Sequence, residues 1–287
     1  MMQNAETTMT ESSPEGGQPS TAPETATSQT DPPAVETRNV TATYGGPPVL
    51  KELNLAISGG ELTALIGPNG AGKSTFFKLL SGVMRPVIGE VRVFGRSIRE
   101  QRVRSAIAYV PQEESIDWDF PISVRSVVLA GRFGRMRADG FPRRLIPPWM
   151  ASATHRQAVE KALEAVEMED LAHRPIGALS GGQKKRVFLA RALAQDARIL
   201  LLDEPLAGVD SRSAEVIFDV FRRTRDEGRT LLLVTHDLAS VEKYADRAVL
   251  LNRTVMATGA PSKVMTLENL ARAFEGGYIP GRSEAAR

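Results

Sequence analysis

The sequence predicts an α/β fold in which a mainly parallel sheet carries helices on both faces. Strand-like apolar runs lie at residues 62–66, 106–110, 199–203 and 230–235. The run at 199–203 is continuous rather than alternating and ends in acids, which fits a buried parallel strand. A glycine-rich loop and a helix-like run follow the first strand, so the sequence also predicts a strand–loop–helix unit.

The glycine-rich loop is a phosphate-binding motif. Residues 67–75 satisfy the pattern G-x-x-x-x-G-K-[ST], in which backbone N–H groups and the start of the next helix face phosphate oxygens. Lys73 is expected to reach the β- and γ-phosphates, and the Ser74 hydroxyl to ligate Mg²⁺. The sequence therefore predicts a P-loop NTPase core whose phosphate loop consists of Gly67, Pro68, Asn69, Gly70, Ala71, Gly72, Lys73, Ser74 and Thr75.

Two smaller regions are expected around this core. Runs at 38–43, 53–57 and 90–94 predict an antiparallel sheet that flanks the nucleotide. Residues from about 113 to 179 predict an inserted helical subdomain. Its expected core is formed by apolar residues at near-helical spacing, namely Val159, Leu163, Val166 and Leu171.

The second motif is Leu179-Ser-Gly-Gly-Gln183, in which Ser180 and Gln183 form an S-x-x-Q capping box at a helix start. Glycines are poor helix formers, so their presence there indicates that another group approaches the backbone closely. With this motif, residues 37–277 resemble the ATP-binding-cassette (ABC) ATPases. The resemblance implies that ATP held by the opposite subunit contacts the signature residues Ser180, Gly181, Gly182 and Gln183.

The resemblance also assigns catalytic roles at the strand ends. Because adjacent residues at a strand end point to opposite sides, Asp203 is expected to face the Mg²⁺ shell and Glu204 the attacking water, as general base. Gln112 is expected to sense Mg²⁺ and the γ-phosphate, and His236 to contact the γ-phosphate. The alternatives are an ordinary acid, a plain loop residue and a structural histidine, respectively.

Two further positions match the same family. Tyr44 stands where ABC ATPases place an aromatic side chain that stacks on adenine, the alternative being an ordinary tyrosine on an edge strand. Asp210 matches an acid that crosses the dimer interface, and capping of a helix N-terminus is its alternative role.

The ends of the chain differ from its centre in composition. Residues 1–34 hold five acids and no Lys, Arg, Leu, Ile, Val, Phe, Tyr or Trp, which predicts a disordered acidic tail. The ABC ATPase domain is expected at 35–279, and a short C-terminal tail at 280–287. The chain has no Cys, and no apolar run approaches the ~20 residues that a membrane span needs.

One phosphate loop and one signature per chain predict a head-to-tail homodimer of cassettes. The segment 116–132 resembles ATPases of manganese, zinc and iron importers, although Trp118 and Phe120 within it could instead be core aromatics. This resemblance implies a polytopic membrane permease, an indirect link to an extracytoplasmic solute-binding protein, and a peripheral position at the cytoplasmic face of the membrane. No nucleic acid is expected as a partner.

Some features depart from the family pattern or allow other interpretations. Lys184-Lys185-Arg186 stands where glutamines are commoner, and Leu206-Ala-Gly replaces a frequent aromatic-Thr-Gly. The alternatives to metal import are another transported solute or, in a different class, a nucleic-acid-associated or translational ABC protein. A basic stretch is interpreted as a solvated loop, with anionic lipid headgroups as its alternative contact; it contains Arg132, Arg135, Arg137, Arg143 and Arg144.

Overall fold

The computed structural model describes residues 31–100, 105–112, 120–139 and 151–274. The helices and strands that it describes belong to the unit Pro32–Arg287. Residues 1–30 of the tail expected at 1–34, the C-terminal tail at 280–287 and Trp118 lie outside the described residues.

The central sheet is mainly parallel, which confirms the α/β class. Its strand order is β10-β9-β3-β8-β7-β6, and only the outer pair β9 and β10 is antiparallel. Every residue of β3, β7 and β8 is buried, as expected where both faces of a sheet are covered. The strands are β3 (Leu62–Ile66), β6 (Ile107–Val110), β7 (Ile199–Asp203), β8 (Thr230–Val234), β9 (Arg247–Asn252) and β10 (Thr254–Gly259).

The two faces of this sheet pack against different layers. In β7, Leu200 and Leu202 join the core beneath the helical layer, whereas Ile199 and Leu201 join the core shared with the second sheet. This alternation follows from the two-residue repeat of a strand. A strand buried on both faces therefore needs apolar residues at every position, which is why these runs are continuous.

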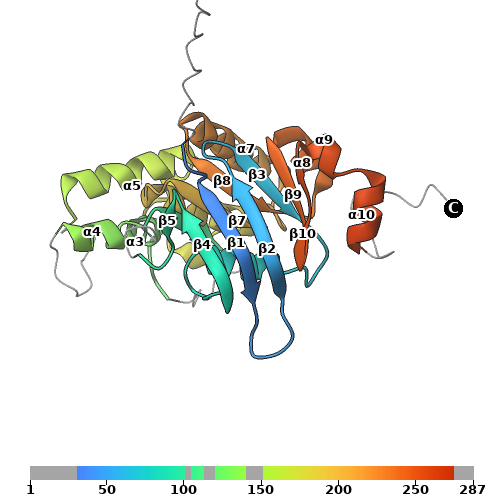
Figure 1. Ribbon diagram of the computed structural model, residues 1–287. Helices are drawn as coiled ribbons and strands as arrows, with labels where there is room; N and C mark the ends of the chain where they lie inside the picture. The colour runs from blue at the N-terminus through green and yellow to red at the C-terminus, as the bar shows by residue number, and fades with distance from the viewer. Residues whose placement is uncertain (1–30, 101–104, 113–119, 140–150, 275–287) are drawn as a thin grey trace, which may run out of the picture. The chain divides into compact units, whose positions relative to one another are not determined.

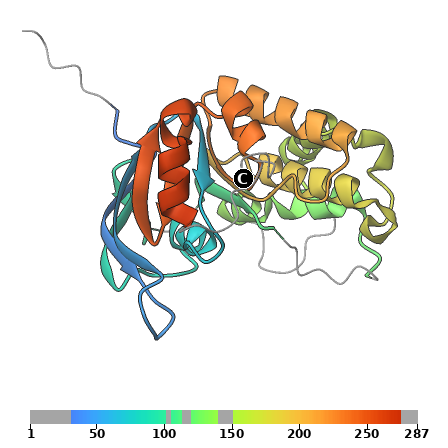
Figure 2. The same cartoon turned by 90° about the vertical axis from the view of Figure 1, so that its right-hand side faces the viewer.

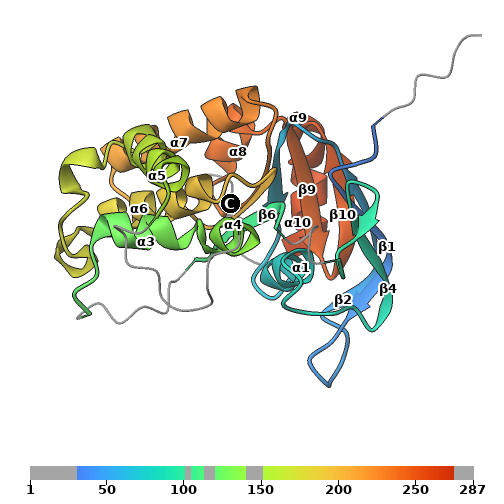
Figure 3. The same cartoon turned by 90° about the vertical axis from the view of Figure 1, so that its left-hand side faces the viewer.

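The second sheet is antiparallel and has the strand order β2-β1-β4-β5 (Figure 1). The three predicted strands are confirmed and begin two or three residues earlier than predicted, and the two-residue strand β5 was not predicted. Helix α1 (Lys73–Leu80) packs between the two sheets through Phe76 and Phe77, which share a core with both (Figure 3). The strands are β1 (Val35–Ala42), β2 (Leu50–Ile57), β4 (Ile88–Val93) and β5 (Arg96–Ser97).

The helical layer covers the other face of the central sheet (Figure 3). Val159 and Leu163 are buried on α5, and Val166 is buried just beyond its end, as their spacing predicted. Leu171 is only partly buried and packs at the edge of the same core. The elements are α3 (Val124–Ala130), α4 (Phe133–Ala138), α5 (Ala153–Ala165), η2 (Glu169–Leu171), η3 (Ile176–Ala178), α6 (Gly181–Ala194) and α7 (Ser211–Asp226).

The C-terminal part of the fold was not predicted from the sequence. Strand β9 adds to β3 in parallel, and β10 turns back along it through Arg253, whose φ is 60°. Helix α10 packs against this pair (Figure 2). Among the described residues, no helix is both long and apolar enough to cross a membrane. The remaining helices are α8 (Leu238–Tyr244), α9 (Pro261–Val264) and α10 (Leu267–Phe274).

Candidate nucleotide site

Four neighbouring parallel strands bring the predicted catalytic residues to one edge of the sheet. Strands β3, β8, β7 and β6 lie side by side in that order. Ligands of open α/β sheets bind outside such carboxyl ends, so the segments that follow these strands form one candidate site. The phosphate loop follows β3, His236 follows β8, Asp203 and Glu204 lie at the end of β7, and Gln112 follows β6.

Two glycines of the phosphate loop are required by close packing. A Cβ on Gly67 would lie 2.0 Å from the carbonyl oxygen of Leu251, which is backbone and has no room to move. Gly72 has φ 96°, and a Cβ there would lie 2.5 Å from Cδ2 of Leu50. Gly72 precedes α1, which has no side-chain cap, so the first N–H groups of α1 are available to an anion.

Lys73 lies inside the loop that it is expected to serve. Its Nζ donates to the carbonyl oxygens of Gly67 at 2.8 Å and Pro68 at 2.9 Å, and the residue is 7% exposed. Burial lowers the pKa of Lys73, whereas the charges of Glu204 and Asp203 oppose that shift. Its expected contact with the β- and γ-phosphates stays a prediction.

Asp203 and Ser74 bring two oxygen donors together. The carboxyl of Asp203 is hydrogen-bonded to the Ser74 hydroxyl and accepts from the Tyr109 hydroxyl at 3.3 Å. Burial raises the pKa of Asp203, and the nearby charge of Glu204 adds to the shift. A hydroxyl and a carboxylate are hard ligands that suit Mg²⁺, so the side chains present fit that ion.

Glu204 is held between two other predicted site residues. Nε2 of Gln112 donates to Oε2 of Glu204 at 2.8 Å, and Nε2 of His236 lies 2.5 Å from Oε1. Glu204 has φ 48°, so the chain leaves the strand at this residue and turns. The direction of its carboxylate is therefore set by a left-handed backbone, not by strand alternation as the sequence suggested.

Tyr44 lies in the loop after β1, so the edge-strand interpretation is wrong. Its hydroxyl lies 3.3 Å from Oγ1 of Thr75, and Nζ of Lys78 donates to it at 3.4 Å. The hydrogen bond with Thr75 is the main cause that lowers the pKa of Tyr44. The residue is 62% exposed, and its hydroxyl contacts the last residue of the phosphate loop.

The signature starts α6 with the predicted capping box. Ser180 accepts from the Gln183 backbone at 3.2 Å, and the Gln183 side chain accepts from the Ser180 backbone at 3.0 Å. The two glycines differ in their surroundings. A Cβ on Gly182 would lie 2.5 Å from Oδ2 of Asp210, whereas a Cβ on Gly181 would meet open space. Gly182 is thus needed for packing, and Gly181 leaves the backbone open to an outside group.

Asp210 caps the next helix. Its Oδ1 accepts from the backbone N–H of Ser213 at 2.9 Å, and this hydrogen bond is the main cause that lowers the pKa of Asp210. The capping role is therefore present within the single chain. Its predicted position at a dimer interface stays a prediction.

The family profile described as ABC transporter matches residues 50–207, which is more than half of the chain. The chain belongs to the ABC transporter family. Members of this family hydrolyse ATP to power transport, so the nucleotide that this cassette uses is ATP.

Three curated relatives match most of this chain. MntA of Synechocystis sp., a manganese transport system ATP-binding protein, is 46% identical over 76% of this chain and 80% of its own length. TroB of Treponema pallidum, a zinc transport system ATP-binding protein, is 44% identical over 85% and 87%. YfeB of Yersinia pestis, described as a chelated iron transport system membrane protein, is 42% identical over 85% and 80%.

Solved structures agree with the fold. A metal-chelate type ABC transporter in an inward-facing conformation matches the cassette with a TM-score of 0.70, 28% identity and coverage of 85% of this chain and 89% of that one. The ADP conformation of the ATP-binding cassette MJ1267 matches with a TM-score of 0.73, 25% identity and coverage of 85% and 99%.

The described part of the basic stretch belongs to helix α4, so the loop interpretation is wrong there, although Arg135 and Arg137 are exposed; Arg143 and Arg144 lie outside the described residues. Arg132 is 5% exposed, and it donates from Nη1 to the carbonyl oxygen of Ala194 at 2.9 Å and from Nε to Nδ1 of His155 at 3.2 Å. Arg135 donates to the carbonyl oxygens of Gln195 and Asp196 at 3.0 and 2.7 Å. Both arginines thus hold the C-terminus of the signature helix, where a positive charge is favourable.

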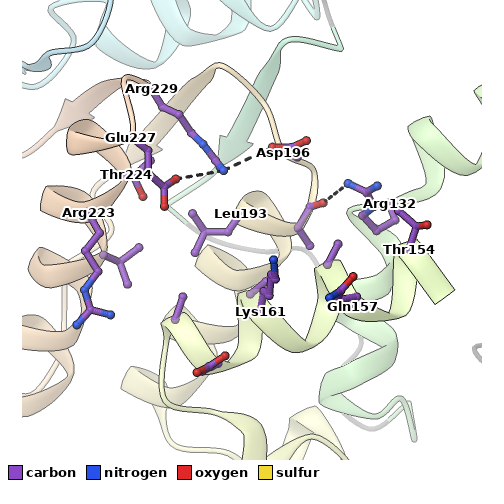
Figure 4. A pocket seen from close by; sticks show the side chains of 16 residues that line it. Arg132, Thr154, Gln157, Lys161, Leu193, Asp196, Arg223, Thr224, Glu227 and Arg229 are labelled. Atoms are coloured by element: carbon purple, nitrogen blue, oxygen red, sulfur yellow. Dashed lines mark hydrogen bonds and ion pairs between the residues drawn. The ribbon is translucent and has the colours of Figure 1, made fainter.

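Arg132 also lines a cavity of about 690 Å³ where the ends of α6 and α7 face α5 (Figure 4). Across that cavity, Arg229 pairs with Glu227 at 3.3 Å and with Asp196 at 3.5 Å. These arginines contact a helix end and acidic side chains of the cassette itself, and the residues of the candidate nucleotide site lie elsewhere.

Three residues that support the site were not predicted from the sequence. Tyr109 donates to Asp203, and Lys78 lies 5.4 Å from the centre of the Tyr44 ring. Lys185 donates to the main chain of Gln112. Tyr109 carries a hydroxyl in an otherwise apolar strand, which was an available signal. Phe120 is 60% exposed, so the core interpretation of this aromatic is wrong.

Proposed function

We propose that this cassette is the ATP-hydrolysing subunit of an importer of divalent metal ions, namely manganese, zinc or iron. Three relatives that are 42–46% identical carry manganese, zinc and chelated iron transport in their names. The metal is the cargo of a membrane permease and does not bind this chain. Export, or another solute, is the alternative within the same family.

The observation that carries the ATPase mechanism is the position of Glu204 between Gln112 and His236. Glu204 acts as the general base that accepts a proton from the attacking water. Each of its two carboxylate oxygens contacts one of these neighbours. The γ-phosphate of ATP competes for Gln112 and His236, which frees the carboxylate to orient water.

Lys73 changes partner in the same step. Its Nζ contacts two loop carbonyls in this structure and turns to the β- and γ-phosphates when ATP enters. The side chains that would hold Mg²⁺ are Ser74 and Asp203, with the amide oxygen of Gln112 as a third donor. When bound, the ion neutralises charge on the phosphate oxygens. Tyr44 stacks on the adenine.

Two cassettes form a head-to-tail homodimer in which each signature completes the site of its partner. The open space at Gly181 supports this arrangement, because a phosphate can reach the start of α6 from outside the chain. Asp210, which caps α7 beside Gly182, faces the same interface.

The permease docks near Phe120, whose exposed ring precedes α3 of the helical layer. An exposed aromatic side chain suits a groove that receives a short helix. The cassette therefore works as a peripheral subunit at the cytoplasmic face of the membrane. Its link to an extracytoplasmic solute-binding protein is indirect, through the permease.

Uptake into vesicles tests this proposal. The cassette is purified with the membrane protein that accompanies it and is reconstituted with ATP inside the vesicles. We expect uptake of radioactive Mn²⁺, Zn²⁺ or Fe²⁺ that depends on ATP and is lost with Glu204→Gln. Uptake of a sugar or a peptide without any of these metals would overturn the metal assignment and leave the ATPase assignment intact.

A further inference from the structure

The signature helix is tied to the γ-phosphate sensor by one side chain. Lys185, on α6, donates from Nζ to the main-chain oxygen of Gln112 at 2.5 Å, across 73 residues of sequence. Lysine has three donors and no acceptor, so its ammonium is well suited to hold a carbonyl oxygen. Lys185 belongs to the Lys-Lys-Arg stretch that departs from the family pattern, and the catalytic mechanism gives it no role.

The contact reaches the general base through Gln112. The main chain of Gln112 is held by Lys185, and its side-chain amide donates to Glu204 at 2.8 Å. A shift of the main chain at Gln112 also moves its side-chain amide relative to Glu204. The three residues therefore form a continuous connection from the surface of α6 to the carboxylate at the end of β7.

Lys185 also shares a helix face with the open signature glycine. Gly181 and Lys185 are four residues apart on α6, so they lie about one turn apart on the same face. A Cβ on Gly181 would meet open space, which leaves this end of α6 accessible from outside. The first part of α6, which a nucleotide of the partner subunit would contact, therefore also contains Lys185, the residue that holds Gln112.

We propose that Lys185 is a positioning residue that makes the two ATP sites of a cassette pair cooperative. This inference rests on the proposed homodimer. ATP in the partner's site contacts the start of α6, and the resulting displacement reaches Gln112 through Lys185. Gln112 then aligns with Glu204 in its own site. Because a coupling between two sites is reciprocal, each occupied site favours closure of the other.

The first test compares variants in the full-length chain. Lys185→Met removes the donor and keeps an unbranched stem, whereas Lys185→Arg keeps a donor of similar reach. Lys161→Met, at an exposed position of α5, is the matched control for the loss of a lysine charge on a helix. ATPase rates against ATP concentration give kcat, KM and the Hill coefficient, and thermal melts report folding.

We expect Lys185→Met to lower kcat roughly tenfold, because the cost of a misplaced catalytic group is of that order. KM should change little, the Hill coefficient should fall towards one, and the melting temperature should stay within about 2 °C of wild type. Lys185→Arg should restore cooperativity, and Lys161→Met should match wild type. An unchanged kcat and Hill coefficient in Lys185→Met would overturn the inference.

A double-mutant cycle with Gln112→Ala separates positioning from a merely structural role. If Lys185 acts through Gln112, adding Lys185→Met to Gln112→Ala should change kcat by less than about twofold. Full additivity of the two effects would overturn the inference, because Lys185 would then act by another route.

Failure of the proposed dimer is distinguishable from failure of this inference. A mixture of Lys73→Ala and Gly181→Asp chains tests the two-chain site without touching Lys185. Recovery of activity in that mixture, together with a wild-type Hill coefficient near one, would overturn only the cooperative role of Lys185. No recovery, despite proven mixed dimers, would overturn the two-chain site and the inference that depends on it.

Discussion

The imidazole of His236 lies 2.5 Å from the carboxylate of Glu204, at the ends of the neighbouring strands β8 and β7. The histidine is 40% exposed, and the glutamate side chain is 14% exposed. The pair is thus partly open to solvent, and the imidazole helps to fix the direction of the carboxylate. We propose that the γ-phosphate of ATP separates these two groups.

Glu204→Gln is expected to retain ATP binding and to slow hydrolysis by roughly 10²–10⁴-fold, which is the usual contribution of a positioned base. The variant should also accumulate an ATP-bound dimer, because the signature residues are unchanged. Single-turnover hydrolysis and size-exclusion chromatography with ATP measure both effects. Glu242→Gln, at an exposed position on α8, is the matched control. Wild-type turnover in Glu204→Gln would contradict the assignment.

Chains carrying Lys73→Ala and chains carrying Gly181→Asp should each be inactive alone. Mixed, they should recover partial activity, because one composite site of the mixed dimer is intact. The structure favours Gly181 for this experiment, since a side chain there meets open space. Gly182→Ala should instead lower the melting temperature, because its Cβ would meet Asp210 at 2.5 Å. Activity of either single variant at the wild-type level would count against the split site.

Asp203→Asn is expected to abolish Mg²⁺-dependent hydrolysis and to raise the melting temperature at neutral pH. Burial raises the pKa of Asp203, so the folded state binds its proton more tightly than the unfolded chain does. Stability from this group therefore falls as pH rises from about 4, the unfolded value, through the raised folded value. Melting curves across this range, recorded without metal, should lose that slope in the variant. An unchanged slope would show that the buried carboxyl carries no such cost.

Tyr44→Ala should raise KM for ATP roughly tenfold and leave kcat near wild type, because stacking of a base on an aromatic ring contributes about 1–3 kcal/mol. Tyr44→Phe should bind ATP nearly as well, since the ring remains and only the contact with Thr75 is lost. Fluorescence titration with an ATP analogue measures the difference. Equal affinities in all three proteins would place the adenine elsewhere.

Phe120→Ala should weaken association with the permease or uncouple ATPase activity from uptake. Basal hydrolysis by the isolated cassette should persist, because Phe120 is exposed and not among the nucleotide contacts. Co-purification measures association with the permease, and radiometal uptake measures coupling. Phosphate release measures basal hydrolysis. Leu267→Ala removes an equally exposed apolar side chain on α10 and serves as control. Normal coupling in Phe120→Ala would remove this residue from the docking surface.

Elements with a local signal could be predicted from the amino-acid sequence alone. Continuous apolar runs mark β3, β7 and β8 because both faces of a central parallel strand are buried. The phosphate loop and the capping box at Ser180 are also local, since their geometry is set within a few residues. The order of these motifs along the chain indicated the family.

Contacts between residues that are far apart in the sequence come from the tertiary packing. Glu204 is directed by a left-handed backbone and by two neighbours that follow other strands, and no pattern within the chain encodes those contacts. The same holds for Arg132, which reads as solvated in the sequence but is buried against the end of α6. The contact of Lys185 with Gln112 joins residues 73 positions apart. Such contacts depend on how the strands are ordered and the helices packed, because spacing along the chain fixes only near neighbours.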